Sequence, residues 1–251
     1  MKKPIVYLLA ALLALLPLTS LALDLAEPLT GTCCYPEGSD ETTATYVYRY
    51  AYPQIAGDSD VAVMINDTYA YEADYIETFT LPVNGDMYGV GEDQYHTDMS
   101  YEVTCSSDTW FSVYFTTLEH VDESTVTRVS AHVFALTGPD AGSVTSLPVV
   151  LGVLDPDEND EWLEERQTAR CDTLVRGLVW EQLQAQAEAG SVTLYDDADR
   201  EYFDGMFYPE EDFYMDADGS LVFFLQEDTM APAEYGILTY RFTIEDLLDE
   251  L

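Results

Sequence analysis

The chain has 251 residues, of which 48 are Asp or Glu and 9 are Lys or Arg, so its formal net charge is -39. Such a polyanion repels phosphate backbones, which excludes nucleic-acid binding, and it attracts basic proteins, cationic peptides or divalent metal ions. Hydrophobic residues at 47% exclude a wholly disordered chain, because that much apolar surface offsets the entropy cost of ordering the backbone.

The first 22 residues predict a signal peptide. Lys2 and Lys3 form a basic start, residues 5–16 are apolar, and small residues precede a cleavage point after Ala22. The alternative is an uncleaved anchor, because about 20 mainly apolar residues can span a bilayer. We therefore expect an extracellular or cell-envelope protein, which is not an integral membrane protein if the signal is cleaved. Cleavage removes both lysines of the chain and makes its charge more negative.

The chain contains four cysteines, Cys33, Cys34, Cys105 and Cys171, and export places them in an oxidising compartment. A disulfide between adjacent residues is strained, so the spacing favours bonds from Cys33 and Cys34 to Cys105 and Cys171, with the pairing left open. Cys171 has a second interpretation, as a small buried hydrophobe on an apolar helical face. No CxxC pair of the kind typical of zinc sites occurs.

Residues 23–44 are rich in Pro, Gly, Ser and Thr, which predicts a linker. Residues 45–52 then alternate as a strand does, and the alternation places Tyr46, Tyr48 and Tyr50 on one face. These rings can form a platform for a sugar or a peptide. The alternative is a sheet face packed under a helix, with the hydroxyl groups at its edge.

The remaining elements predict an α+β fold of two small units, each an antiparallel sheet packed against a helix. Apolar residues at steps of three and four predict helices over about 62–79 and 160–189. Shorter apolar or alternating runs predict strands, at about 99–106, 110–118, 125–136, 221–225 and 238–244. The two domains are expected at 45–120 and 121–251.

A search for catalytic and cofactor motifs finds no GxSxG, HExxH, P-loop or GxGxxG pattern. The three histidines, His96, His120 and His132, are too far apart to share a helical face, and we expect ordinary surface or core residues. Residues 155–159 begin like a calcium-binding EF-hand loop, but Asp160 and Arg166 replace the glycine and the glutamate that such a loop needs. We therefore predict no catalytic, cofactor or metal site.

Three short motifs carry a family resemblance: Tyr52-Pro53-Gln54-Ile55, Ile65-Asn66, and Ala231-Pro232-Ala233-Glu234-Tyr235-Gly236 before the last strand. In this order they resemble the paired, DUF3298-like extracytoplasmic domains shared by RsiV-type anti-sigma factors and PdaC-type peptidoglycan deacetylases. The resemblance covers about residues 45–251 and implies that 231–232 and Gly236 form the bend into the final strand. The chain departs from the family at 117–120, where Thr-Leu-Glu-His replaces Gly-Gly-Ala-His.

The resemblance implies a non-catalytic binding module for a cationic protein, with lysozyme as the ligand of RsiV-like domains, but without anti-sigma or deacetylase parts. The candidate contact residues are Glu119, His120, Tyr46, Tyr48 and Tyr50. One alternative function is a cell-wall glycan-acting enzyme or accessory domain, because carboxylates are abundant. The other is an acidic structural or cation-binding surface protein.

Overall fold

The computed structural model describes residues 23–251 apart from 89–93, 122–123, 156 and 158–159. The predicted signal peptide, residues 1–22, lies outside this part of the chain. Within the described residues, no helix has both the length and the apolar composition that crossing a membrane requires.

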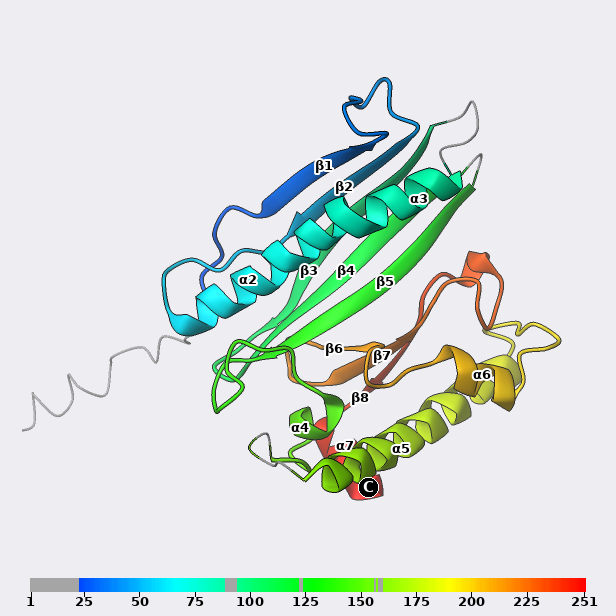
Figure 1. Cartoon of the computed structure of the whole chain (residues 1–251). Coiled ribbons are helices and arrows are strands. Elements are labelled where there is room, and N and C mark those ends of the chain that lie inside the picture. Colours follow the sequence, from blue (N-terminus) through cyan, green and yellow to red (C-terminus); the bar gives the residue numbers. More distant parts are fainter. Residues whose placement is uncertain (1–22, 89–93, 122–123, 156, 158–159) are drawn as a thin grey trace, which may run out of the picture.

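A five-stranded sheet forms the first half of the molecule (Figure 1). Its strands follow one another in chain order: β1 (Leu29–Tyr35), β2 (Tyr46–Tyr52), β3 (Tyr95–Ser106), β4 (Trp110–Val121) and β5 (Ser124–Ala135). β2 and β3 are parallel, and the other three neighbouring pairs are antiparallel. The parallel pair departs from the expected antiparallel sheet. It arises because the helices between these strands carry the chain back to the starting end of the sheet.

The segment predicted as a linker contains β1, which pairs with the whole of β2. Gly31, one of the residues whose composition predicted a linker, serves packing: a Cβ there would lie 2.2 Å from the ring of Tyr50. The expected domain boundary at residue 120 also needs correction, because β5 pairs with β4 in the same sheet. The first sheet therefore spans residues 29–135.

One face of this sheet, the helix face, is covered by α2 (Asp60–Tyr75), a π-helical turn η1 (Ile76–Thr80) and α3 (Leu81–Tyr88) (Figure 1). Ser59 caps the start of α2, where its side chain accepts a hydrogen bond from the backbone of Ala62. The buried residues of α2 and η1 recur at the predicted steps, as Ala62, Ile65, Tyr69, Ala73 and Ile76. This confirms the helix predicted over about 62–79.

The second half holds a three-stranded antiparallel sheet of β6 (Phe213–Met215), β7 (Leu221–Leu225) and β8 (Leu238–Phe242). The long helix α5 (Glu161–Glu188) buries Cys171, Val175, Val179 and Leu183 in a cluster that includes residues of this sheet. Asp160 caps α5 by accepting a hydrogen bond from Trp162, so the EF-hand-like residues lead into a helix cap, as the sequence indicates. Short helices complete this half: α4 (Leu147–Val150), α6 (Arg200–Met206) and α7 (Ile244–Glu250).

The closing segment forms the bend that the family resemblance implies. A single 3-10 turn, η2 (Ala233–Tyr235), ends at Gly236, whose backbone has φ 63° and ψ -150°. This conformation is open to glycine and costly for residues with a Cβ. β8 follows at once, and Thr243 and Asp246 then form a reciprocal capping box at the start of α7.

The molecule is built in layers: α2 and α3, the five-stranded sheet, the three-stranded sheet, and α5 (Figure 1). The three-stranded sheet packs against the second face of the first sheet, where Tyr114 and Tyr214 have ring centroids 5.0 Å apart. The backbone of Met215 donates to Ser112 Oγ at 3.0 Å, and the amide of Gln226 bonds both backbone groups of Val129 at 3.0 and 2.8 Å. These layers confirm the α+β class.

Candidate functional site

The tyrosine stripe of β2 lies on the helix face and is buried. The exposed fractions of Tyr46, Tyr48 and Tyr50 are 3%, 8% and 7%. Their hydroxyl groups bond neighbours inside this layer; that of Tyr50, for example, donates to Glu77 at 3.3 Å. Burial raises the pKa of Tyr50 to about 12. These rings pack under the helices, which removes them from any surface that a partner can reach.

Glu119 and His120, the other two candidate contact residues, are neighbours on β4 and point to opposite faces of the sheet. Glu119 pairs with Thr97 on the helix face, whereas His120 pairs with His96 on the second face. Both side chains are partly exposed. The structure therefore does not join the five predicted contact residues into one surface.

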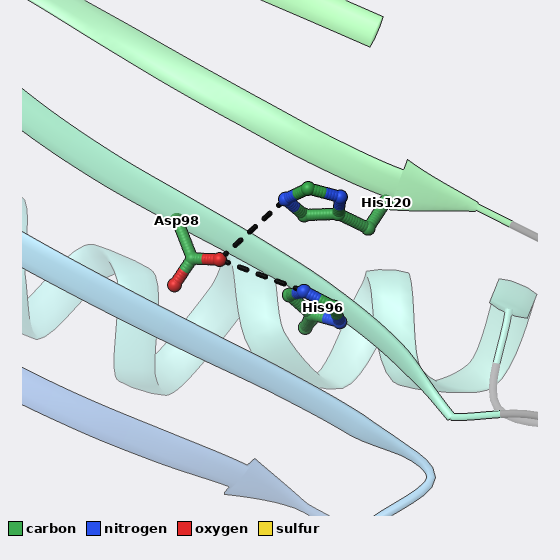
Figure 2. Close-up of side chains that lie close together, drawn as sticks. All are labelled: His96, Asp98 and His120. Carbon is green, nitrogen blue, oxygen red and sulfur yellow. Dashed lines mark ion pairs between the residues drawn. The ribbon is translucent and has the colours of Figure 1, made fainter. Parts of the chain in front are cut away.

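His120 instead belongs to a group that the sequence did not indicate, formed with His96 and Asp98 (Figure 2). His96 and Asp98 are two residues apart on β3, so both point to the second face, and the β3–β4 register places His120 opposite His96. The two imidazole rings stack with centroids 4.1 Å apart, and Nε2 of each ring lies 3.6 Å from Oδ2 of Asp98. Two imidazoles and one carboxylate form a set of ligands that can hold a metal ion.

Neighbouring side chains orient this group. Thr125 Oγ1 lies 3.0 Å from Nδ1 of His120, on the side of the ring away from Asp98. Arg49, from the parallel neighbour β2, donates to Oδ1 of Asp98 at 3.0 Å and also pairs with Glu41 at 2.8 Å. Asp98 therefore uses one oxygen for the guanidinium group and turns the other towards the imidazoles. Burial, followed by the nearby His120, lowers the pKa of His96, which favours its neutral form.

The third histidine, His132, is a core residue, one of the two ordinary environments expected for the three histidines. It lies on the helix face of β5, where its ring stacks on Tyr69 with centroids 5.9 Å apart. Burial lowers the pKa of His132 to about 4, so the ring is neutral at physiological pH.

The cysteines do not form the expected bonds: all four are free thiols. Cys33 packs in the cluster on the helix face, while Cys105 and Cys171 are buried in the cluster of the second half. Cys34 points to the face opposite Cys33, because the two are successive residues of β1. The alternative interpretation of Cys171 agrees with its environment, since its side chain is fully buried against apolar neighbours.

Three open hollows on the second half are lined by carboxylates. The first, of about 420 Å³, lies around the start of α6, and a second of about 410 Å³ lies along α5. A third of about 200 Å³ lies between α4 and α5. Among the described residues, none that line these hollows is Lys, Arg or His. The carboxylates are Asp197, Asp199 and Glu201 in the first, Glu164, Glu165 and Asp172 in the second, and Asp140, Asp155 and Glu164 in the third.

The fold is similar to that of a solved bacterial protein. A member of the DUF3298 family from Bacteroides fragilis matches with a TM-score of 0.52 at 13% identity, over 93% of this chain and 94% of that one. The fold is that of a DUF3298 protein. A DUF3298 family protein from Pseudomonas aeruginosa matches at 11% identity and a TM-score of 0.49, over 90% and 93% of the two chains. No family profile and no curated protein sequence matches the chain.

Within the DUF3298 fold, the motifs that carried the resemblance have structural roles. Asn66 on α2 binds Ile55: Oδ1 accepts from its backbone N–H at 2.8 Å, and Nδ2 donates to its carbonyl at 3.0 Å. The Ile65-Asn66 motif therefore fixes the chain where it leaves β2 and turns towards the helix.

The sequence held one signal of the pair formed by His96 and Asp98, which is their spacing of two residues. This spacing places both side chains on one face only if the segment is a strand.

Proposed function

We propose that the protein is an exported, non-catalytic binding module for a cationic protein or peptide, with lysozyme as the first ligand to test. The observation that carries the proposal is the set of hollows whose linings are rich in carboxylates and, among the described residues, include no Lys, Arg or His. Nine basic residues can neutralise at most nine of 48 negative charges, so the field around these hollows is strongly negative. Such a field steers cations inward and speeds association.

The hollow at α6 offers the chemistry that a lysine or arginine side chain needs. Its carboxylates come from Asp197, Asp199 and Glu201, and Tyr202 and Met206 line it with side chains that are 39% and 38% exposed. An aromatic ring beside carboxylates attracts a cation through its π face and packs against the aliphatic part of the side chain. On the other half, Glu119 is a further proposed contact, because it is partly exposed on the helix face.

Binding to lysozyme at about 0.15 M salt, repeated over a range of salt concentrations, tests the proposal. We expect a complex that weakens steeply as salt rises. Lysozyme with acetylated lysines keeps its shape and loses most of its positive charge, and it is expected not to bind. Absence of a complex with native lysozyme removes lysozyme as the ligand, and equal binding of the acetylated form removes the electrostatic basis of the proposal.

A pair of charge-matched variants locates the contact. The first combines Asp197→Asn, Asp199→Asn and Glu201→Gln; Asn at 199 retains an oxygen that can cap α6. The second combines Glu245→Gln, Asp249→Asn and Glu250→Gln on α7, outside the hollows and exposed. We expect the first variant to bind lysozyme more weakly than the second. Equal weakening would assign the binding to diffuse charge and not to the α6 hollow.

A further inference from the structure

We infer that His96, Asp98 and His120 form a binding site for a divalent transition-metal ion of the zinc class. The site lies on the second face of the five-stranded sheet (Figure 2). It is separate from the acidic hollows of the second half. The inference therefore does not depend on binding of a cationic protein.

The distances fit one shared ion. Nε2 of His96 and Nε2 of His120 each lie 3.6 Å from Oδ2 of Asp98. One ligand atom from each of the three residues lies within 4.8 Å of the other two. Two atoms bound to one tetrahedral zinc ion lie about 3.3 Å apart, because each bond is about 2.0–2.2 Å long. A separation of 3.6 Å is too long for a good hydrogen bond. Small rotations of the side chains therefore bring all three atoms onto one ion.

The orientation of the ligands is already set. A histidine that binds a metal through Nε2 usually donates its Nδ1 proton to a neighbour, and Thr125 Oγ1 lies at 3.0 Å to accept it from His120. The carboxylate of Asp98 is held through Oδ1 by Arg49, which leaves Oδ2 for the ion. Hydrogen bonds of this kind to the ligands fix their geometry before the metal arrives.

The charges of the cluster also favour a cation. Among the described residues, Arg49 is the one arginine that forms an ion pair with Asp98, and it is shared with Glu41. Two carboxylates thus oppose one guanidinium group.

The ligand set selects the class of metal. Imidazole nitrogen suits zinc, copper and nickel, whereas calcium and magnesium take oxygen ligands. The side chains of His96, Asp98 and His120 are 35%, 38% and 30% exposed, so an ion reaches them directly from solvent. Three protein ligands leave one position of a tetrahedral zinc ion for water.

Titration of the purified protein with Zn²⁺ against a competing chelator tests the inference. The Cys34→Ser background is used, because Cys34 lies on the same face and a free thiol binds zinc. We expect one Zn²⁺ per chain, bound in the presence of excess Ca²⁺ and Mg²⁺. His96→Ala, His120→Ala and Asp98→Asn should each lose this site. Thr125→Val should weaken it by about 10-fold, because only the orientation of His120 is lost.

The matched control is Glu102→Gln, which removes a negative charge from the same face of β3, four residues from Asp98, and should bind as the parent does. The NMR spectrum gives a second measurement, since the chain has three histidines. Zn²⁺ should shift the imidazole signals of His96 and His120 and leave those of the buried His132 unchanged. Equal zinc affinity in the parent and in His120→Ala would overturn the inference. So would a loss of zinc affinity in Glu102→Gln as large as the loss in Asp98→Asn.

Discussion

Glu210 carries a carboxyl group in an environment that favours its protonated form. Its Oε2 accepts a hydrogen bond from the backbone of Leu147 at 3.3 Å, while its Oε1 is buried without a hydrogen-bond partner. Burial raises the pKa of Glu210 to about 7, and burial raises that of Asp212 to about 6. A raised pKa is one requirement of a glycosidase acid. Neither residue lines the three hollows described above, so their geometry favours a structural role.

This carboxyl group makes stability depend on pH. The folded state keeps the proton of Glu210 up to about pH 7, whereas an exposed glutamate loses it near its ordinary pKa of 4.5. Between these values the folded state binds more protons, so the free energy of unfolding falls as pH rises through this window. Urea unfolding at pH 5 and pH 8 should show this fall.

In Glu210→Gln the free energy of unfolding should depend less on pH, because glutamine cannot ionise. Its side chain still offers an oxygen to the backbone N–H of Leu147. The control is Glu211→Gln, which removes the charge of an exposed neighbour. If both variants change the pH dependence equally, general charge repulsion explains it and burial of Glu210 does not.

At the scale of elements, the sequence located strands where they are buried and missed their polar ends. β3 and β4 each have 12 residues, but the predicted strands covered only 99–106 and 110–118. Alternation of apolar and polar residues marks the part of a strand that contacts a core. His96, Asp98 and His120 lie beyond that part, where both faces carry polar residues. The register that brings them together is a tertiary property, which a single sequence does not contain.

β1 was missed for the same reason: its pairing is a tertiary property, and its glycine and threonine residues indicated a linker. Here the pairing partner β2 and the ring of Tyr50 define the strand, and Gly31 is required because that ring occupies the space of a Cβ. We expect Gly31→Ala to lower the free energy of unfolding by about 1–3 kcal/mol, the usual cost of overpacking. Denaturant unfolding measures this.

Gly177→Ala provides the control for this substitution. Gly177 lies inside α5, and a Cβ there would meet nothing within 4 Å. Alanine should therefore raise the free energy of unfolding by about 0.5–1 kcal/mol. Equal stability of the two variants would mean that β1 is not packed as described.

At the scale of the whole molecule, charge and architecture come from different features of the sequence. The order of the predicted helices and strands gave the α+β architecture. The three short motifs gave the family resemblance, and two of them, at Asn66 and Gly236, fix the path of the backbone. Net charge predicted the sign of the surface. The positions of the hollows were not predictable, because they depend on how α4, α5 and α6 lie together.

An excess of negative charge should make the fold more stable in salt. The arginine ion pairs, such as those of Arg176 with Asp172 and Arg200 with Asp204, lose strength when screened. Repulsion among 48 acidic residues, opposed by only nine basic ones, is screened as well and is the larger effect. We expect Tm to rise between low salt and about 0.5 M NaCl, measured by differential scanning calorimetry. A falling Tm would show that the ion pairs dominate.

The amide of Gln226 has a consequence for how copies of the chain meet. β5 is the last strand of its sheet, and the backbone N–H and carbonyl of Val129 point outward from it. An outward row of such groups is a template on which another molecule can add a strand and begin an aggregate. Gln226 occupies both groups at the middle of this row. A substitution that removes its amide would open a position for intermolecular pairing.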